Sequence, residues 1–325
     1  MQIISPANIR LWSRLGACGA FGQATLDLPL INDKAVVLTS DLCTFSGLER
    51  FKKKYPDRLY NTGIAEQNMV GIAAGLAKEG FTPFATTYAT FAAMRCADQV
   101  KVNMGYMQLG VKLVGMTAGL SAGILGATHM SLEDIAVMRS VPNIVILSPA
   151  DCLSVVKATW TAAETEAPVY LRLSGTMNNP IVYKEDFNFE IGKAITLREG
   201  NDIAVLATGS MVYNALKAAE QLEEKGLSVR VVDMHTIKPV DLETIQKACS
   251  TKLIVTVEEH SVYGGLGGAV AEILALKSDK PPHLIIGVSG NYPHAASYQF
   301  LLEQTGLSAE KIALKIQTTY EEIYK

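Results

Sequence analysis

The sequence predicts an α/β protein built from two doubly wound, mostly parallel-sheet domains. Short apolar runs alternate with helix-like segments along the chain, each run is almost continuously apolar, and the rhythm lapses only once. Continuous apolar runs are typical of parallel strands that helices cover on both faces. A chain of 325 residues is long enough for two domains that each bury a core.

In the first half, five apolar runs predict strands and the segments between them predict helices. The strands are expected at 35–40, 81–87, 111–117, 143–149 and 169–174. The helices are expected at 7–26, 64–79, 88–104, 131–140 and 151–164. A stretch rich in Asn, Pro and scattered charges follows and interrupts the pattern, which indicates a linker.

The α/β rhythm then resumes in the second half. Strands are expected at 203–210, 228–235, 253–260 and 283–290, and helices at 211–225, 240–249 and 266–277. The predicted boundaries are therefore a first domain at 1–175, a linker at 176–191 and a second domain at 192–325. In such sheets ligands bind beyond the carboxyl ends of the strands, so the segments after each run are the candidate sites.

Composition excludes several classes of partner. Charged residues make up 19% of the chain and the net charge is -3, so we expect neither a nucleic-acid partner nor a membrane surface. The five cysteines are widely spaced and never form a CxxC pair, which indicates reduced thiols. The start of the sequence lacks a cationic leader followed by an apolar core, and we expect a cytoplasmic protein.

Several chemistry-bearing residues follow the predicted strands. Asp41 comes after the first run, and Tyr88, Phe91 and Met94 follow the second at a spacing of three, as on one face of a helix start. Taken singly these signals are weak. Asp41 could be a helix N-cap, and aromatic residues at helical spacing more often belong to a core.

Two further residues complete the candidate set. Glu66 stands at the start of an apolar, small-residue helix, where a lone carboxylate most often only complements the helix dipole. His129 follows a loop whose glycines allow unusual backbone angles, and mobile polar loops favour function.

Two apparent motifs are set aside. The segment "YGGLGGAV" (263–270) lacks the context of a dinucleotide-binding loop, and we interpret it as backbone packing. The segment "VEEH" (257–260) supplies two carboxylates and an imidazole. Adjacent strand residues point to opposite faces, so a strand-end salt bridge or a subunit contact is expected instead of a metal site.

Read together, several segments resemble the C-terminal half of transketolase over essentially the whole chain. They are "SDL" (40–42), "GIAEQNMVGIAAGLAKEGFTPFATTYATF" (63–91), "GATHM" (126–130), "VPNIVILSPAD" (141–151) and "LATGSMVYNALKAAEQLEEKGLSVRVVDMHTIKPVD" (206–241). The resemblance implies a pyrimidine-binding domain followed by the family's C-terminal domain. The family's diphosphate and metal motif, GDG followed by a later Asn, does not occur in this sequence. The chain therefore resembles the second subunit of a split transketolase.

The resemblance also implies roles for the cofactor-side residues. Glu66 would hydrogen-bond N1′ of the thiamin aminopyrimidine and share a proton with it. Phe91 would stack on that ring, with Tyr88 as a second aromatic beside it and Met94 lining the same pocket. Asp41 would be a further acid on the cofactor side.

On the substrate side the resemblance implies that His129 hydrogen-bonds the sugar, but the chain departs from the family nearby. Leu125 replaces an acid that contacts a donor hydroxyl, and a family histidine falls near Thr117. The family's phosphate-binding arginine falls on Gly175, so Arg172 is the expected substitute.

The implied activity is transfer of a two-carbon ketol unit between sugar phosphates, with thiamin diphosphate as cofactor. The implied partner is an N-terminal transketolase subunit that carries the diphosphate-binding domain and binds Mg2+ (or Ca2+ or Mn2+), so this chain would supply none of the metal ligands. We expect a heterotetramer with a homodimer of this chain at its centre.

Two alternatives stay open. "MRCADQV" (94–100) is similar to a helix of 2-oxo acid dehydrogenase E1 β subunits and deoxyxylulose-phosphate synthases, which share the two-domain plan. A non-catalytic scaffold subunit is the other, although it would not need Glu66, Phe91 and His129.

Overall fold

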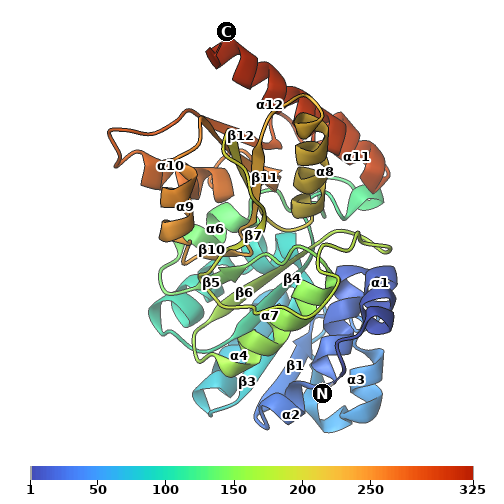
Figure 1. Ribbon diagram of the computed structural model, residues 1–325. Coiled ribbons are helices and arrows are strands. Elements are labelled where there is room, and N and C mark those ends of the chain that lie inside the picture. The colour runs from blue at the N-terminus through green and yellow to red at the C-terminus, as the bar shows by residue number, and fades with distance from the viewer. Residues whose placement is uncertain (1, 325) are drawn as a thin grey trace.

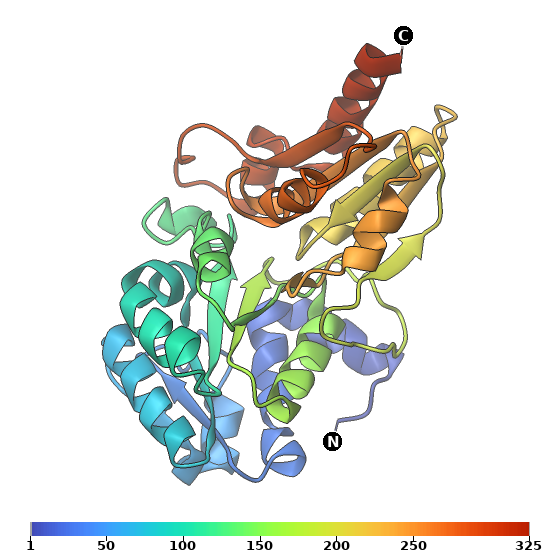
Figure 2. The ribbon, with the colours of Figure 1, turned by 90° about the vertical axis from the view of Figure 1, so that its left-hand side faces the viewer.

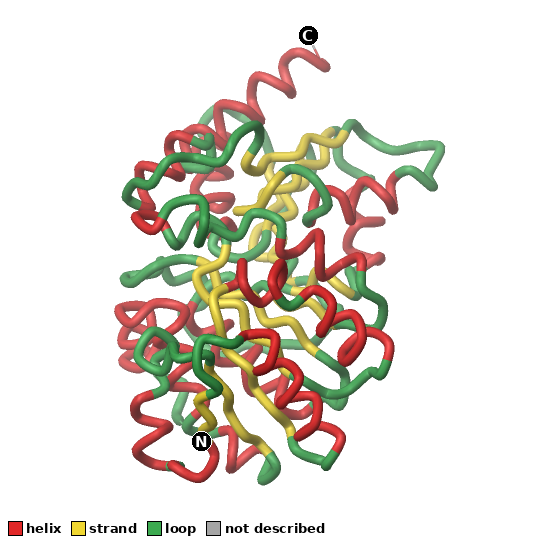
Figure 3. The backbone as a smooth tube through the Cα atoms, turned by 180° about the vertical axis from the view of Figure 1, so that it is seen from behind, coloured by secondary structure: helices red, strands yellow, loops and turns green. Residues whose placement is uncertain are grey.

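The computed structural model describes residues 2–324, which form two sheets flanked by helices (Figure 1). The predicted α/β class is confirmed, because most of the strand pairings within the two sheets are parallel. Seen from behind, the strands of both sheets occupy the middle of the molecule and helices lie on either side (Figure 3).

Over the described residues from Gln2 onward, the first part of the chain contains seven α-helices, six strands and four short helical turns. In chain order they are α1 (Pro6–Thr25), α2 (Leu28–Ile31), β1 (Ala35–Thr39), α3 (Glu49–Lys54), η1 (Pro56–Arg58), β2 (Leu59–Asn61), α4 (Glu66–Lys78), β3 (Thr82–Tyr88), η2 (Phe91–Arg95), α5 (Ala97–Gln99), η3 (Val100–Tyr106), β4 (Lys112–Ala118), η4 (Gly123–Leu125), α6 (Asp134–Ser140), β5 (Val145–Leu147), α7 (Cys152–Glu164) and β6 (Val169–Ser174).

The second part, described as far as Tyr324, contains six strands and five helices. In chain order they are β7 (Ile195–Arg198), β8 (Ile203–Ala207), α8 (Met211–Glu223), β9 (Val229–Asp233), β10 (Thr236–Lys238), α9 (Leu242–Ala248), β11 (Leu253–Ser261), α10 (Leu266–Leu274), β12 (His283–Val288), α11 (Tyr298–Gln304) and α12 (Ala309–Tyr324). Its sheet has the order β12-β11-β8-β9-β7, with only β7 antiparallel to its neighbour.

The first sheet has the order β10-β5-β6-β4-β3-β1-β2, and its core lies on both faces. Successive side chains of a strand point to opposite faces. Accordingly, Val37 of β1 belongs to a cluster with Trp12 of α1, while Val36 and Leu38 belong to a second cluster with Met69 of α4. Figure 2 shows helices on either side of this sheet.

Local signals explain where the helices of the first part begin. Ser5 accepts a hydrogen bond from Asn8 N and precedes Pro6, a residue suited to the first helical turn. Asp151 and Ser154 form a reciprocal capping box at the start of α7.

The two sheets meet at their carboxyl edges. Ser148, just after β5, donates its N–H to His235 O after β9 at 2.8 Å and accepts from Gly209 N after β8 at 3.1 Å. The short strand β10, which belongs to the second part, pairs antiparallel with β5. It is therefore the edge strand of the first sheet. The second part therefore lies directly above the edge at which a doubly wound sheet places its ligand site.

The segment expected as one helix at 88–104 is wrong in its start and in its type. Tyr88 is the last residue of β3, where it pairs with Met116 of β4, and the chain that follows is mostly π-helical, in η2 and η3. Pairing with β4 fixes Tyr88 in the strand, so Tyr88, Phe91 and Met94 do not share one helical face.

Of the two interpretations of "VEEH", the structure fits the strand-end ion pair, because Glu258 Oε2 lies 3.9 Å from His260 Nδ1 near the end of β11. It contradicts the subunit contact, because these side chains are buried within the chain. Glu258 and Glu259 are buried, and the Glu258 carboxylate accepts from Leu266 N and Gly267 N at the start of α10. Gly265 of "YGGLGGAV" makes room for this cap, because a Cβ there would lie 1.9 Å from Glu258 Oε2.

Candidate functional site

The candidate site forms where three adjacent parallel strands end. β4, β3 and β1 are neighbours in the first sheet, so the segments that follow them meet at the same edge. Tyr88 ends β3, and the loop that begins after β4 carries His129. Glu66 reaches the same region from the start of α4, which a short loop joins to the end of β2.

Three rings contact one another edge-on at this place. The centroid of Tyr88 lies 5.8 Å from that of Phe91 and 5.5 Å from that of His129, and Phe91 lies 5.4 Å from His129. These are the separations and tilted arrangements that aromatic pairs prefer. Burial raises the pKa of Tyr88, so its phenol stays protonated at neutral pH and can donate a hydrogen bond.

Glu66 is connected to these rings through an arginine. The Glu66 side chain is only 4% exposed, and its Oε1 accepts a hydrogen bond from Arg95 Nη1 at 2.7 Å. The guanidinium carbon of Arg95 lies 4.0 Å from the centroid of the Phe91 ring. A planar cation thus bridges the buried carboxylate and the aromatic face, which combines an ion pair with a cation–π contact.

The structure therefore brings together four of the predicted site residues: Glu66, Tyr88, Phe91 and His129. It adds Arg95, which the sequence analysis missed. The spacing of four between Phe91 and Arg95 could have predicted their contact, since residues four apart are neighbours on a helical surface.

Two predicted residues lie outside this network of contacts. Met94 is 55% exposed on the helical turn next to Arg95. Asp41 is exposed, has a φ of 59°, and exchanges hydrogen bonds of 3.0 Å with the side chain of Asn61 at the end of β2. Asp41 is not the N-cap of a helix, because the next helix, α3, begins at Glu49.

Arg172 is a correction to the expected set. It is 1% exposed and its guanidinium donates to Asp134 Oδ2 at 2.8 Å and to the main-chain oxygen of Glu259 at 2.8 Å. A side chain enclosed in this way cannot reach a substrate phosphate. At the position of the family's arginine, Gly175 has a φ of 88°, which strongly favours glycine.

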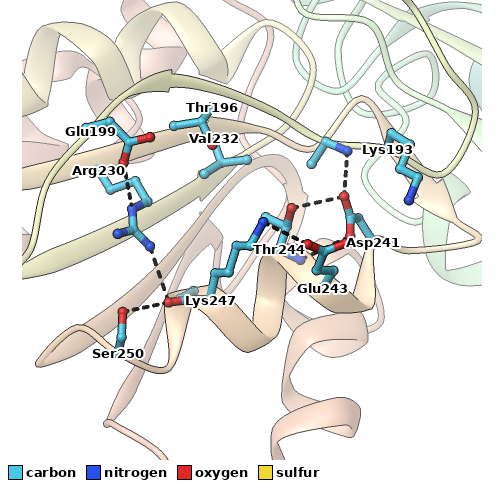
Figure 4. A pocket seen from close by; sticks show the side chains of 12 residues that line it. Lys193, Thr196, Glu199, Arg230, Val232, Asp241, Glu243, Thr244, Lys247 and Ser250 are labelled. Atoms are coloured by element: carbon cyan, nitrogen blue, oxygen red, sulfur yellow. Dashed lines mark hydrogen bonds and ion pairs between the residues drawn. The ribbon is translucent and has the colours of Figure 1, made fainter.

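A separate cavity of about 650 Å³ lies in the second part, beside β7, β9 and α9 (Figure 4). Charged and hydroxyl side chains line it, but they interact with one another: Lys247 with Glu243 at 2.8 Å and Arg230 with Glu199 at 3.4 Å. Asp241 accepts from Thr244 N and caps α9. This cavity holds none of the predicted site residues.

Within residues 2–324, no group of three or more His, Cys, Asp or Glu side chains is arranged to hold a metal ion. Over the same residues, no helix combines the length and the apolar character needed to cross a membrane.

Comparison with known proteins identifies the family. The chain matches the transketolase pyrimidine binding domain over residues 19–179 and the transketolase C-terminal domain over residues 192–312. It is 40% identical over 298 residues to a "Putative transketolase C-terminal section" from Methanocaldococcus jannaschii, covering 91% of this chain and 93% of that protein. The chain belongs to the transketolase family.

Two other similar proteins refine the place of this transketolase-family chain. It is 42% identical over 297 residues to one subunit of an apulose-4-phosphate transketolase from Phocaeicola vulgatus, covering 90% of this chain and 94% of that protein. A solved structure described as "Split gene transketolase, inactive beta4 tetramer" is 39% identical, with a TM-score of 0.85 over 94% of this chain and 98% of that one.

The site of this transketolase-family chain thus lies within the segment that matches the pyrimidine binding domain. Glu66, Tyr88, Phe91 and His129 all fall between residues 19 and 179. The polar cavity lies within the match to the C-terminal domain.

Proposed function

We propose that this chain is the C-terminal subunit of a thiamin diphosphate-dependent transketolase that transfers a two-carbon ketol unit between sugar phosphates. It acts only together with a separate subunit that binds the diphosphate. The observation that carries the proposal is the buried Glu66 carboxylate, which lies beside the Phe91 ring with a planar nitrogen group between them.

The residues fit an aminopyrimidine ring. Arg95 makes two contacts, an N–H hydrogen bond to Glu66 and a flat contact with Phe91, and an aminopyrimidine can make both. Arg95 is 45% exposed along its side chain, so it can leave this position without breaking the core. The match to the transketolase pyrimidine binding domain also supports this cofactor.

Each residue then has a defined task. Glu66 holds a proton at the ring nitrogen and exchanges it, and Phe91 and Tyr88 orient the flat ring. His129 lies against both rings and hydrogen-bonds the sugar. Thiamin diphosphate, when bound, supplies the carbon nucleophile that attacks the ketose carbonyl.

Apolar side chains around the site support a partner subunit. Ile64 and Ile124 are each 80% exposed, and Phe45, whose ring centroid lies 6.4 Å from that of Tyr88, is also exposed. Exposed apolar groups gathered beside a polar site are typical of a protein interface. We propose that the diphosphate-binding subunit covers them and supplies the ligands of Mg2+.

A second exposed apolar group supports pairing between copies of this chain. Ile72 on α4, Val102 and Tyr106 on η3 and the adjacent Met107 are exposed. We propose that two copies meet here, at the centre of a heterotetramer. The similar protein described as a beta4 tetramer shows that a relative of this chain associates with itself.

Reconstitution with a diphosphate-binding subunit tests the function. Thiamin diphosphate and Mg2+ are titrated calorimetrically into each subunit alone and into the mixture, and ketol transfer from a ketose phosphate is assayed beside pyruvate decarboxylation. Tight binding and ketol transfer by the mixture alone are expected. Binding that does not depend on this chain would favour a scaffold, and pyruvate decarboxylation without ketol transfer would favour the 2-oxo acid enzymes.

A further inference from the structure

Glu259 connects the second sheet to the loop that carries His129. It lies near the end of β11 and is 1% exposed. Its Oε1 accepts from Leu120 N at 2.6 Å, and its Oε2 accepts from Tyr298 Oη at 2.6 Å and from the Ser210 hydroxyl. Burying a carboxylate costs free energy unless its oxygens accept hydrogen bonds. The three donors offset this cost and thereby hold Glu259 in place.

The hydrogen bond from Leu120 N to Glu259 lies where the loop at 119–131 begins. Gly119 N donates to Ser131 O at 2.9 Å and Ser131 N donates to Gly119 O at 3.1 Å, which closes the loop at 119–131. Gly119 has a φ of 69°, and a Cβ there would lie 2.5 Å from Glu259 Oε1. Glycine at this position lets the carboxylate approach the backbone.

The other end of the loop is tied to the same residue through Arg172. The Nη2 of Arg172 donates to the main-chain oxygen of Glu259 at 2.8 Å and contacts Ser131 O at 3.4 Å. The Nε of the same guanidinium forms an ion pair of 2.8 Å with Asp134 Oδ2. Arg172 therefore contributes to the junction between the two parts.

We propose that Glu259 is a positioning residue for the site. From the second sheet it fixes the loop at 119–131, and thereby holds His129 against Tyr88 and Phe91. The link to catalysis rests on the proposed function, whereas the link to the loop does not. Burial raises the pKa of Glu259, and the hydrogen bonds from its donors act in the opposite direction.

Glu258 provides a matched control. It is the preceding residue of the same strand and is equally buried. Each of its two carboxylate oxygens accepts a hydrogen bond from a backbone N–H group. These N–H groups belong to Leu266 and Gly267 of α10, not to the loop. Glu258→Gln therefore disturbs a buried carboxylate of the same strand without touching the base of the His129 loop.

Hydrogen–deuterium exchange measures the link directly on the whole chain. In Glu259→Gln, an amide donor faces the Ser210 and Tyr298 hydroxyls, and we expect exchange in the peptide covering 119–131 to become about tenfold faster. In Glu258→Gln the acceleration is expected in α10 instead. Tyr298→Phe removes one donor, keeps the carboxylate and gives a smaller acceleration in the loop; it carries the test if Glu259→Gln does not fold.

Unchanged exchange of the loop in both Glu259→Gln and Tyr298→Phe would overturn the proposal, as would an equal acceleration in Glu258→Gln. Kinetics of the reconstituted enzyme give the second measurement. We expect Glu259→Gln to raise KM for the ketose about tenfold with a smaller change in kcat, and His129→Ala to add little in that background. A loosened loop with unchanged KM would leave the positioning role intact and contradict the role proposed for His129.

Discussion

The carboxyl edge of the first sheet and the polar cavity of the second part use charged residues in different ways. At the first, the buried Glu66 lies beside aromatic rings and pairs with Arg95, whose side chain is half exposed. In the cavity, acids and bases lie in pairs along an open wall and largely satisfy one another. The volume of a cavity therefore does not indicate a reactive site in this protein, because the acidic and basic side chains of the large cavity neutralise one another.

The largest expected difference between the two regions is in activity. Glu66→Gln in the reconstituted complex should lower kcat for ketol transfer about a thousandfold, because the amide cannot take up and return the proton. Glu243→Gln makes the same exchange at the cavity and should leave kcat within about twofold. Steady-state assays of both variants decide the comparison. Activity of Glu66→Gln within a few-fold of the unmodified complex would remove Glu66 from the mechanism.

The next difference concerns stability and pH. His235 comes three residues after Val232, which lines the cavity. Its ring stacks on Phe189 with the centroids 4.1 Å apart, and burial lowers its pKa from 6.5 to about 4. As the pH falls below about 6.5 the unfolded chain binds this proton first, so stability present at neutral pH is lost between about pH 6.5 and 4.

His235→Phe keeps the stacked ring and removes this titration. Between pH 7 and pH 5 the unmodified chain should lose about 2 kcal/mol more unfolding free energy than the variant. Urea denaturation at the two pH values measures the loss. Identical pH dependence of the two proteins would show that His235 takes up its proton equally well in the folded state.

A smaller effect is expected from releasing the arginine at the candidate site. Arg95→Met frees Glu66 and the face of Phe91, and thiamin diphosphate should then bind the reconstituted complex about tenfold more tightly. Arg230→Met removes the corresponding cation from the cavity and should leave this affinity unchanged. Calorimetry with Mg2+ present measures both. Weaker binding in Arg95→Met would mean that Arg95 helps to hold the cofactor.

The smallest effect is expected at the rim of the cavity. Lys247 and Glu243 form a pair in which both side chains are more than two-thirds exposed. Water and salt screen such pairs, so Lys247→Gln should leave the denaturation midpoint unchanged. A clear shift of that midpoint would show that the rim of the cavity stabilises the fold.

Regular elements with strong local patterns could be predicted from the sequence. The strand expected at 169–174 is β6, and the helix expected at 7–26 is α1 (Pro6–Thr25). Elements that depend on distant pairing were missed. β10 has only three residues and forms because β5 pairs with it from another part of the chain. The amphipathic helix α12 also lay beyond the last predicted element.

The candidate site shows the same division. Glu66, Phe91 and His129 were indicated by their places after apolar segments and by the family resemblance. Arg95 was missed, and Arg172 was expected to bind a phosphate. An arginine side chain is long and flexible, so the position of its guanidinium depends on which acid or ring lies within reach in the folded chain. For Arg172 that acid is Asp134, which is buried and 38 residues away in sequence.

The sequence by itself determined the α/β class, the order of the main strands and helices, and the residue types present at the strand ends. These depend on local patterns of apolar residues and on capping, which act within one or two turns of chain. Only the tertiary structure decided that Arg95 pairs with Glu66, 29 positions away, and that Glu259 accepts a hydrogen bond from Leu120 N, 139 positions away. Such contacts depend on how segments far apart in the sequence pack together, and a buried charge accepts whichever donors that packing provides.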